Sequence, residues 1–247
     1  MTIRLFVALP LVAGAELSLP PGAARHAQVR RVQPGDALWL FDGGGSDWPA
    51  TVLAMGRSDV VVRIGEPVAV ARELSREVTL ALGMPANERM DWLVEKATEL
   101  GVARIQPLLT ARSVLRLTGE RAQRKREHWQ AVAEAACEQC GRSRVPRVEP
   151  VRTLAEWLPL APPGLRLLLS LRPGARPLPQ QAAALVPAVP LCALSGPEGG
   201  FTDAEEAAAL AAGFAATAAG PRVLRAETAP LAVLAWLALQ EAPAAPR

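Results

Sequence analysis

From Val78 onward, short apolar runs alternate with segments whose apolar residues have helical spacing. An apolar run at 78–84 precedes one such segment, and another run follows it at 103–109. The residues that share a face of this helix are Met90, Leu93, Val94, Ala97 and Leu100. Strands that alternate with helices form a mostly parallel sheet covered on both faces. We therefore predict an α/β domain over residues 74–247.

Several helix boundaries in this region are marked by residues that cap or end helices. Asn87 is placed to cap the first helix, and a long helix is predicted over 120–140 with Gly141 ending it. Two later helices start with the Thr-x-x-Glu spacing of a capping box, at 153–156 and at 202–205. The other predicted elements are strands at 165–170 and 214–218 and helices at 180–186 and 231–239.

The first 73 residues have a different rhythm, with short β-like runs separated by turn signals. These runs lie at 4–8, 37–41, 50–54 and 59–64. The segment 42–45, Asp-Gly-Gly-Gly, lacks the Lys and Ser/Thr of a phosphate loop and is predicted to be a hairpin turn. Strands of this length and spacing favour a small barrel. We predict a β-barrel domain over residues 1–73.

The start of the chain resembles a short secretory signal, but its apolar run is broken by Pro10 and preceded by the single basic residue Arg4. We favour a first strand at this position. Three cysteines do not make a disulfide framework in a chain of 247 residues. The apolar stretch 231–239 is too short to span a bilayer. These features predict a cytoplasmic protein with no membrane partner.

The positive charge of the chain is concentrated in one segment. The formal net charge is +3, and residues 111–152 hold ten basic and five acidic residues. Most of these basic residues are arginines, whose planar fork suits phosphate oxygens. A solvated helix face with i,i+4 charge pairs would have the same composition. Charge alone leaves an RNA-binding surface and a solvated helix face equally open.

The segment 194–201, Leu-Ser-Gly-Pro-Glu-Gly-Gly-Phe, follows an apolar run that begins at Val189. Clustered glycines mark tight turns or close approach of a backbone to something else. Ligands bind beyond the carboxyl ends of strands in open α/β sheets, and a second Gly-Pro segment follows at 220–230. Neither segment has the spacing of a dinucleotide or phosphate loop. The pattern indicates an unidentified ligand, with purely structural turns as the alternative.

Four longer stretches carry a resemblance that runs nearly end to end. They are 87–102 (NERMDWLVEKATELGV), 128–146 (HWQAVAEAACEQCGRSRVP), 194–201 (LSGPEGGF) and 220–229 (GPRVLRAETA), with 4–7 (RLFV) and 29–36 (VRRVQPGD) in support. Together they resemble the bacterial ribosomal RNA small-subunit methyltransferase E family. One departure is that the family often has a pair of histidines where this chain has only His26, so the resemblance assigns His26 no role.

The resemblance implies a fold and an activity. Members of the family are uracil-N3 methyltransferases of the SPOUT superfamily that use S-adenosyl-L-methionine. They have an N-terminal PUA-like β-barrel and a C-terminal α/β domain with a parallel sheet and a deep trefoil knot, and they act as homodimers on a specific uridine of 16S ribosomal RNA in the small subunit. General folding rules disfavour knots, so patterning alone would not have suggested one.

The resemblance also implies roles for individual residues. Arg225 is expected to stabilise the uridine oxygen as N3 loses its proton, while Glu198 and Glu227 either accept that proton or brace their loops. The cofactor-binding residues are expected to be Ser170, Leu171, Leu194, Ser195, Gly196, Pro197, Glu198, Gly199, Gly200, Val223, Leu224, Arg225, Ala226 and Thr228. The RNA-binding residues are expected to be Arg4, Arg31, Arg112, Gln139, Arg142 and Arg144. Gln139 and Arg142 are also candidates to enter the site of the other subunit.

Two other functions compete with this one. A non-catalytic RNA-binding or ribosome-assembly protein would bind RNA without a cofactor, and a ribose 2′-O methyltransferase with a related knot would modify a different atom. Cys137 and Cys140 have the Cys-x-x-Cys spacing of zinc or redox sites. A single pair at i and i+3 on a helix is more typical of packing, so no metal is predicted.

Overall fold

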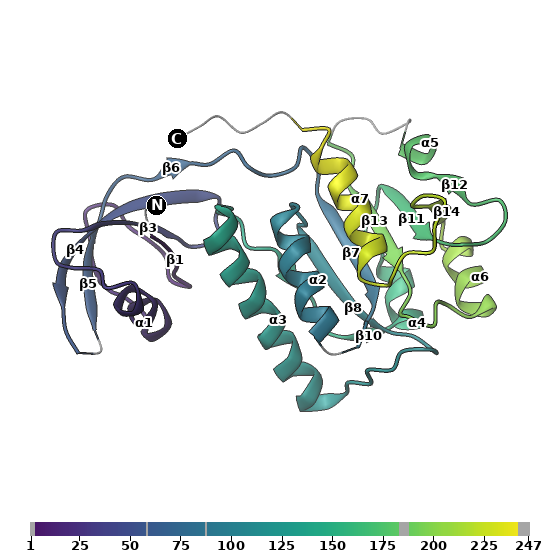
Figure 1. Cartoon of the computed structure of the whole chain (residues 1–247), viewed down its shortest axis with the longest axis horizontal. Coiled ribbons are helices and arrows are strands. Elements are labelled where there is room, and N and C mark those ends of the chain that lie inside the picture. The colour runs from purple at the N-terminus through teal and green to yellow at the C-terminus, as the bar shows by residue number, and fades with distance from the viewer. Residues whose placement is uncertain (1–2, 58, 87, 183–187, 242–247) are drawn as a thin grey trace. The chain divides into compact units, whose positions relative to one another are not determined.

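The computed structural model describes residues 3–57, 59–86, 88–182 and 188–241 (Figure 1). The chain forms two compact units, one of Met1–Arg72 with Glu134–Val145, the other of Glu73–Ala133 with Pro146–Arg247. The expected division was two contiguous ranges that meet between 73 and 74. The structure differs by adding the end of the long helix and the turn after it to the first unit.

The first unit is built on a sheet of six short strands. The strand order is β1-β3-β4-β5-β2, and β6 pairs with β4. The strands are β1 (Arg4–Phe6), β2 (Glu16–Ser18), β3 (Ala37–Phe41), β4 (Ser46–Met55), β5 (Val60–Ile64) and β6 (Val68–Ala69). A helix that the sequence analysis missed, α1 (Pro21–Val29), packs its small residues Ala23, Ala24 and Ala27 into the core beside the strands.

The predicted hairpin turn at 42–45 is confirmed, because it joins β3 to β4 and these strands pair antiparallel. Gly43 and Gly45 have φ values of 87° and 102°, in the left-handed region that favours glycine. The amide N–H of Gly45 donates to the carbonyl oxygen of Ser143 at 3.0 Å. The turn therefore also holds the 134–145 segment against the sheet of this unit.

Arg4 makes the central polar contacts of the first unit. Its guanidinium donates to the carbonyl oxygen of Cys137 at 2.8 Å and to a carboxylate oxygen of Asp47 at 2.7 Å. Ser143 Oγ donates to the same Asp47 oxygen at 2.5 Å. The side chains of Arg4 and Asp47 are only 8% and 1% exposed. The network ties β1 and β4 to the segment that contains the end of the long helix.

Two expected RNA contacts are corrected by burial. The side chain of Arg4 is enclosed in this network, and Arg142 is 3% exposed. A buried guanidinium cannot meet a phosphate of an RNA backbone that passes over the surface. Arg4 and Arg142 are therefore structural residues of the first unit.

The second unit contains the predicted parallel sheet. Its strand order is β10-β8-β7-β13-β11-β14-β12, with β9 paired to β8, and every pairing within it is parallel. The strands are β7 (Val78–Gly83), β8 (Arg104–Leu109), β9 (Arg147–Val148), β10 (Arg152–Thr153), β11 (Leu165–Leu169), β12 (Arg176–Pro177), β13 (Leu191–Ser195) and β14 (Ala215–Ala218). The helical elements are α2 (Glu88–Glu99), α3 (Gly119–Cys140), α4 (Leu154–Trp157), η1 (Leu158–Leu160), α5 (Leu178–Ala182), α6 (Asp203–Ala211) and α7 (Thr228–Ala238).

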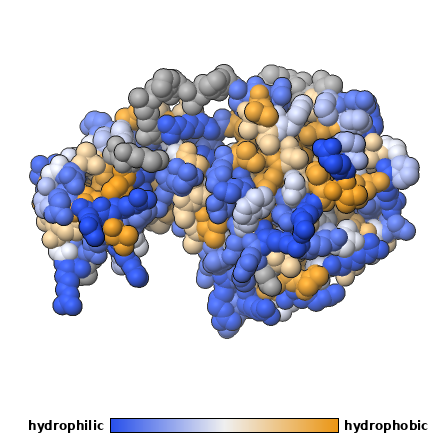
Figure 2. Space-filling view, in the orientation of Figure 1, coloured by the Kyte–Doolittle hydropathy of each residue, from blue (hydrophilic) through white to orange (hydrophobic). Residues whose placement is uncertain are grey.

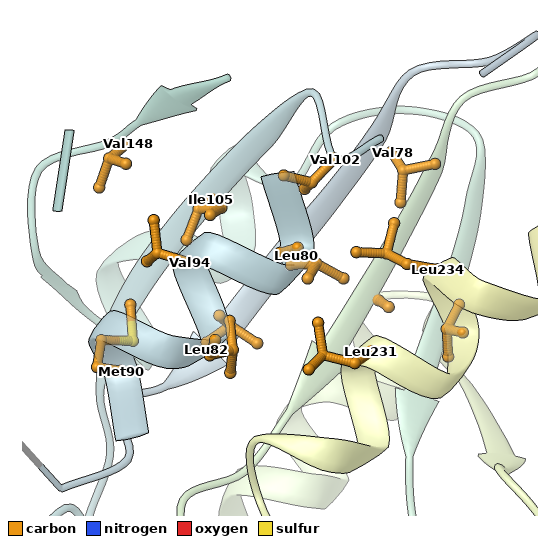
Figure 3. Close-up of a cluster of buried hydrophobic side chains, with 14 of the residues drawn as sticks. Val78, Leu80, Leu82, Met90, Val94, Val102, Ile105, Val148, Leu231 and Leu234 are labelled. Atoms are coloured by element: carbon orange, nitrogen blue, oxygen red, sulfur yellow. The ribbon is translucent and has the colours of Figure 1, made fainter. Parts of the chain in front are cut away.

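Both faces of this sheet are covered by apolar side chains, because alternate residues of each strand point to opposite faces. Leu80 and Leu82 of β7 pack with residues of α2 and α7, as Figure 3 shows, and the buried Trp129 of α3 belongs to the same cluster. Ala81 lies in a second cluster that includes Trp157 of α4 and residues of α6. The sheet thus fixes a rigid edge at the carboxyl ends of its strands.

The strand order brings three separate chain segments to one place. β11 pairs with β13 on one side and with β14 on the other. All three strands are parallel, so the segments that follow Leu169, Ser195 and Ala218 leave the same edge of the sheet. Two of these segments are the Gly-Pro loops that were singled out in the sequence.

The remaining sequence expectations are met in part. Both capping boxes are confirmed, because the Thr153 and Thr202 side chains accept from the amide N–H three residues later and the Glu carboxylates reciprocate. The helix predicted at 180–186 instead begins at Leu178 and is described to Ala182, and 183–187 lie outside the described residues, as does Asn87. No helix in the described ranges is long and apolar enough to cross a membrane.

Replacing Arg4 by Met is expected to destabilise the first unit by about 3–5 kcal/mol, because it removes the Arg4 guanidinium from its ion pair with the buried Asp47 carboxylate. Arg63→Met is the matched control, since Arg63 and Glu16 form an ion pair with side chains 59% and 55% exposed. That control should cost less than about 1 kcal/mol. Denaturant unfolding of the three proteins measures both values. Equal, small losses in the two variants would contradict the structural role of Arg4.

Candidate active site

A cavity of about 640 Å³ opens beyond the carboxyl ends of β11, β13 and β14. This volume is in the range of sites that hold cofactors and small substrates. The cavity is lined by Arg89, Arg112, Leu169, Ser170, Leu171, Ser195, Gly196, Pro197, Glu198, Gly199, Gly200, Phe201, Glu206, Thr217, Ala219, Gly220, Arg222, Val223, Leu224, Arg225, Ala226 and Ala229. Most of the sequence-predicted cofactor residues are therefore together at one wall; Leu194 and Thr228 are outside the lining.

Backbone packing at the 196–200 loop requires glycine at positions 83 and 196. A Cβ on Gly196 would lie 3.1 Å from the backbone Cα and carbonyl carbon of Gly200. A Cβ on Gly83, at the end of β7, would lie 2.5 Å from Cδ of Pro197. Gly200 has a φ of 67°, and its amide N–H donates to the carbonyl oxygen of Pro197 at 2.8 Å. Side chains are excluded on the inner side of the loop, so its backbone forms the cavity wall.

Glu198 is fixed by hydrogen bonds to a neighbouring segment. Its Oε1 accepts from the amide N–H of Ala86 at 3.0 Å and from Nη1 of Arg89 at 3.1 Å. Burial by itself raises the pKa of Glu198, but the backbone N–H donors and the Arg89 charge outweigh burial and hold the pKa below its usual value. A carboxylate with a lowered pKa is a weak base. The geometry therefore favours the loop-bracing role for Glu198.

Arg89, on the first turn of α2, is a site residue that the sequence analysis did not single out. Besides binding Glu198, its Nε lies 4.0 Å from a carboxylate oxygen of Glu227. Glu227 is 8% exposed, and its Oε2 is buried without a hydrogen-bond partner among the described residues. Glu227 does not line the cavity. The helix pattern gave no signal for Arg89, because its partners lie more than a hundred residues away.

Arg112 was expected to bind RNA, and the structure gives it a contact with the glycine loop. Its Nη1 donates to the carbonyl oxygens of Gly199 and Phe201 at 2.9 and 3.1 Å. The neighbouring amide N–H of Ala111 donates to Oε1 of Glu205 at 2.7 Å. The segment after β8 thus supports the loop from the outside, while Arg112 itself stays exposed at the cavity wall.

The segment 219–226 forms another part of the cavity wall. Arg222 and Arg225 are exposed, and neither side chain makes a hydrogen bond or ion pair with the described part of the chain. Val223 is 78% exposed and Leu171, from the segment after β11, is 73% exposed. In Figure 2, apolar surface gathers over the part of this unit that holds β14 and α6. Exposed apolar side chains beside free guanidinium groups suit a ligand that has both a ring face and anionic groups.

The other predicted RNA contacts belong to the first unit. Arg31, Gln139 and Arg144 are all exposed there. Arg31 follows α1 and has a φ of 57°, and the guanidinium of Arg144 lies against Gly45. These three side chains are available to solvent, in contrast with Arg4 and Arg142.

Cys137 and Cys192 are buried and Cys140 is half-buried, and all three are free thiols. Burial raises the pKa of the Cys192 thiol to about 12. Among the described residues, no group of three or more His, Cys, Asp or Glu side chains is placed to hold a metal ion.

Two family models match the chain. The RNA methyltransferase domain matches residues 72–238, and the RNA methyltransferase PUA domain matches residues 19–65. The first match covers the parallel sheet and the whole cavity wall, and the second covers most of the sheet of the first unit. The family models therefore assign the two parts of the chain in the order that the sequence motifs predicted.

Named relatives and solved structures agree with these models. Ribosomal RNA small subunit methyltransferase E of Synechocystis is 35% identical over 96% of this chain and 77% of its own, and that of Bacillus subtilis is 31% identical over 86% and 85%. A protein from Legionella pneumophila with the bound cofactor SAM has a TM-score of 0.91 at 32% identity, covering 97% of this chain and 98% of that one. Ribosomal RNA small subunit methyltransferase E from Neisseria gonorrhoeae, bound to S-adenosyl methionine, has a TM-score of 0.87 at 34% identity, covering 96% and 97%. This chain belongs to the ribosomal RNA small subunit methyltransferase E family.

Proposed function

We propose that this protein transfers a methyl group from S-adenosyl-L-methionine to N3 of a specific uridine in the 16S ribosomal RNA of the small subunit. The observation that carries the proposal is the cavity wall, where the backbone of a glycine loop faces a segment with a free arginine at 225. The loop backbone can bind a cofactor, and the guanidinium of Arg225 can stabilise an anionic transition state. Membership of the family supports both assignments.

The residues at the cavity fit the cofactor. Gly200 leaves open space on the side where a Cβ would point, so backbone groups of the 196–200 loop are within reach of a ligand. Leu171 and Val223 offer apolar surface for the faces of an adenine ring. We assign cofactor binding to the lining residues among 170–171, 195–200 and 223–226, with Leu194 and Thr228 supporting them from behind. When bound, the cofactor supplies a methyl group already activated on a sulfonium.

The chemistry that remains for the protein is to make N3 of uridine nucleophilic. N3 carries a proton between two carbonyl groups; that proton passes to solvent, and the negative charge left on the ring spreads onto the two carbonyl oxygens. Arg225 lines the cavity with no competing partner, so its guanidinium is placed to stabilise that charge. Glu198 and Glu227 hold Arg89 and their loops and are positioning residues in this proposal. Hydrogen-bond donors hold the pKa of Glu198 below its usual value, and Glu227 does not line the cavity, so neither carboxylate is assigned the proton.

The RNA would also contact the first unit. Arg31, Gln139 and Arg144 are exposed there and supply cationic and amide groups for phosphate and base edges. The protein would act as a homodimer: α7 is apolar on all sides, and an apolar helix with exposed residues such as Leu239 beside it calls for a covering partner. We also propose a cytoplasmic location, because ribosomal RNA is the proposed substrate.

The proposed function is tested by methyl transfer to small ribosomal subunits that lack the modification, followed by mass spectrometry of the nucleosides. The expected product is 3-methyluridine. A methyl group on a ribose 2′ oxygen would show a ribose methyltransferase. Tight RNA binding without any transfer or cofactor binding would show an assembly protein. Either outcome would overturn the proposal.

Gly196→Ala is expected to weaken S-adenosyl-L-methionine binding at least tenfold, since the added Cβ meets rigid backbone of Gly200 rather than a flexible side chain. Gly22→Ala is the control, because a Cβ on Gly22 has nothing within 4 Å. Titration calorimetry measures both affinities, and circular dichroism checks that both variants fold. A folded Gly196→Ala protein with unchanged affinity would remove the loop from the cofactor site.

Arg225→Gln is expected to lower kcat by about 10²–10³-fold, the loss typical of removing one donor to a developing oxyanion. Cofactor affinity should fall far less than kcat, because the other lining residues of the cofactor site remain. Arg225→Lys keeps the charge and should recover part of the rate. Single-turnover transfer at saturating cofactor and RNA measures the chemical step, and raising the pH should partly rescue Arg225→Gln, because uridine then ionises without help. Full activity of the glutamine variant would contradict the catalytic assignment.

A further inference from the structure

Four arginines line the same cavity: Arg89, Arg112, Arg222 and Arg225. Two carboxylates, Glu198 and Glu206, line it as well. Each carboxylate already has a cation, because Glu198 binds Arg89 and Glu206 forms an ion pair with Arg172. The negative charges of the wall are therefore neutralised within the protein. Arg112, Arg222 and Arg225 have no acidic partner among the described residues.

These arginines differ in what they are free to do. Arg112 donates hydrogen bonds from Nη1 to the carbonyl oxygens of Gly199 and Phe201, and these bonds hold it to the loop. Arg225 is the group that the proposed reaction uses at the base. Arg222 is exposed and makes no hydrogen bond or ion pair within the described part of the chain. It has no role in the fold or in the chemistry described so far.

The backbone before Arg222 fixes the position from which this side chain extends. Gly220 has a φ of 126°, a conformation that side chains rarely adopt, and Pro221 has a φ restricted by its ring. The Gly-Pro pair therefore turns the chain sharply as it leaves β14 and limits the motion of the next residue. An exposed guanidinium that extends from this turn at the cavity rim, with no partner among the described residues, is available to an external anion.

The charge of the cofactor does not explain this surplus. S-adenosyl-L-methionine carries one carboxylate, an ammonium group and a positive sulfonium, so it brings a net positive charge into a wall that is already cationic. The single carboxylate of the cofactor cannot neutralise Arg112, Arg222 and Arg225 together, so the surplus positive charge is available to a second, anionic ligand. A nucleotide in an RNA chain supplies that charge through its phosphates.

We infer that Arg222 binds a backbone phosphate beside the target uridine and so seats the nucleotide at the cavity, a role that rests on the proposed function. Arg225 then faces the base and Arg222 faces the backbone. The two residues are three positions apart on one segment, so the strand that carries the target is held by the same element that stabilises its reacting base. Arg222 is a substrate-binding residue and not a cofactor ligand.

The test compares Arg222→Gln with Arg222→Lys, using binding of 16S ribosomal RNA at several potassium concentrations. The glutamine variant should bind RNA roughly tenfold more weakly at low salt, as expected for the loss of a charged hydrogen bond. Its slope of log affinity against log salt should be shallower by about 0.7–0.9, the contribution of one phosphate contact. The lysine variant retains the charge and should keep the slope. Calorimetry should give unchanged cofactor affinity in both variants.

Steady-state transfer to small subunits separates this role from a catalytic one. In Arg222→Gln, KM for the subunit should rise while kcat at saturating subunit stays near that of the unchanged protein. An unaltered salt slope, or a loss of cofactor affinity, would overturn the phosphate assignment while leaving the methyltransferase proposal standing. Absence of any methyl transfer by the unchanged protein would instead refute the proposed function, and the RNA-binding slopes would still decide the role of Arg222.

Discussion

The close approach of backbone to backbone at the ends of β7 and β13 is the contact on which the rest of the site depends. Pro197 leaves no room for a side chain at position 83, and Gly196 packs against the backbone of Gly200. The loop is thereby pressed into the edge of the sheet, and its outward side becomes the wall of a cavity. A ligand can reach backbone groups there because no side chains intervene. The glycines thus allow the loop to pack against the sheet, and this packing in turn exposes backbone groups to a ligand.

The second constraint is how charges are paired around that wall. The carboxylate of Glu198 is used to hold the loop to the start of α2, and the resulting contacts lower its pKa. Arg112 holds the same loop through carbonyl oxygens. Because Glu198 and Arg112 are used to hold the loop, the charged side chains of the cavity that have no partner among the described residues are Arg222 and Arg225 of the 219–226 segment. Charged side chains that make structural contacts are thus separated from those that are available to bind a substrate.

The same distinction holds in the first unit. Arg142 lies in the arginine-rich segment 111–152, and Arg4 was expected to bind RNA from the family resemblance, yet burial makes both residues structural. The guanidinium of Arg4 donates to a carbonyl oxygen at the end of α3 and to the buried Asp47 carboxylate, and so ties strands to the helix end. Removing it would take this cation away from a carboxylate that is buried in a medium of low dielectric constant. Arg31, Gln139 and Arg144, by contrast, are exposed in the same unit.

The sequence by itself determined the parallel sheet, the two capping boxes, the hairpin turn at 42–45 and the position of the glycine loop after a buried strand. These features depend on local periodicity and on residues a few positions apart, which patterns record directly. Only the tertiary structure decided that β11 lies between β13 and β14, that Arg89 binds Glu198, and which arginines are buried. Those contacts join residues far apart in the chain, such as Arg4 and Cys137, 133 positions apart. Periodicity carries no information about such partners. Which charged side chains of the cavity are paired and which are unpaired could therefore be seen only in the tertiary structure.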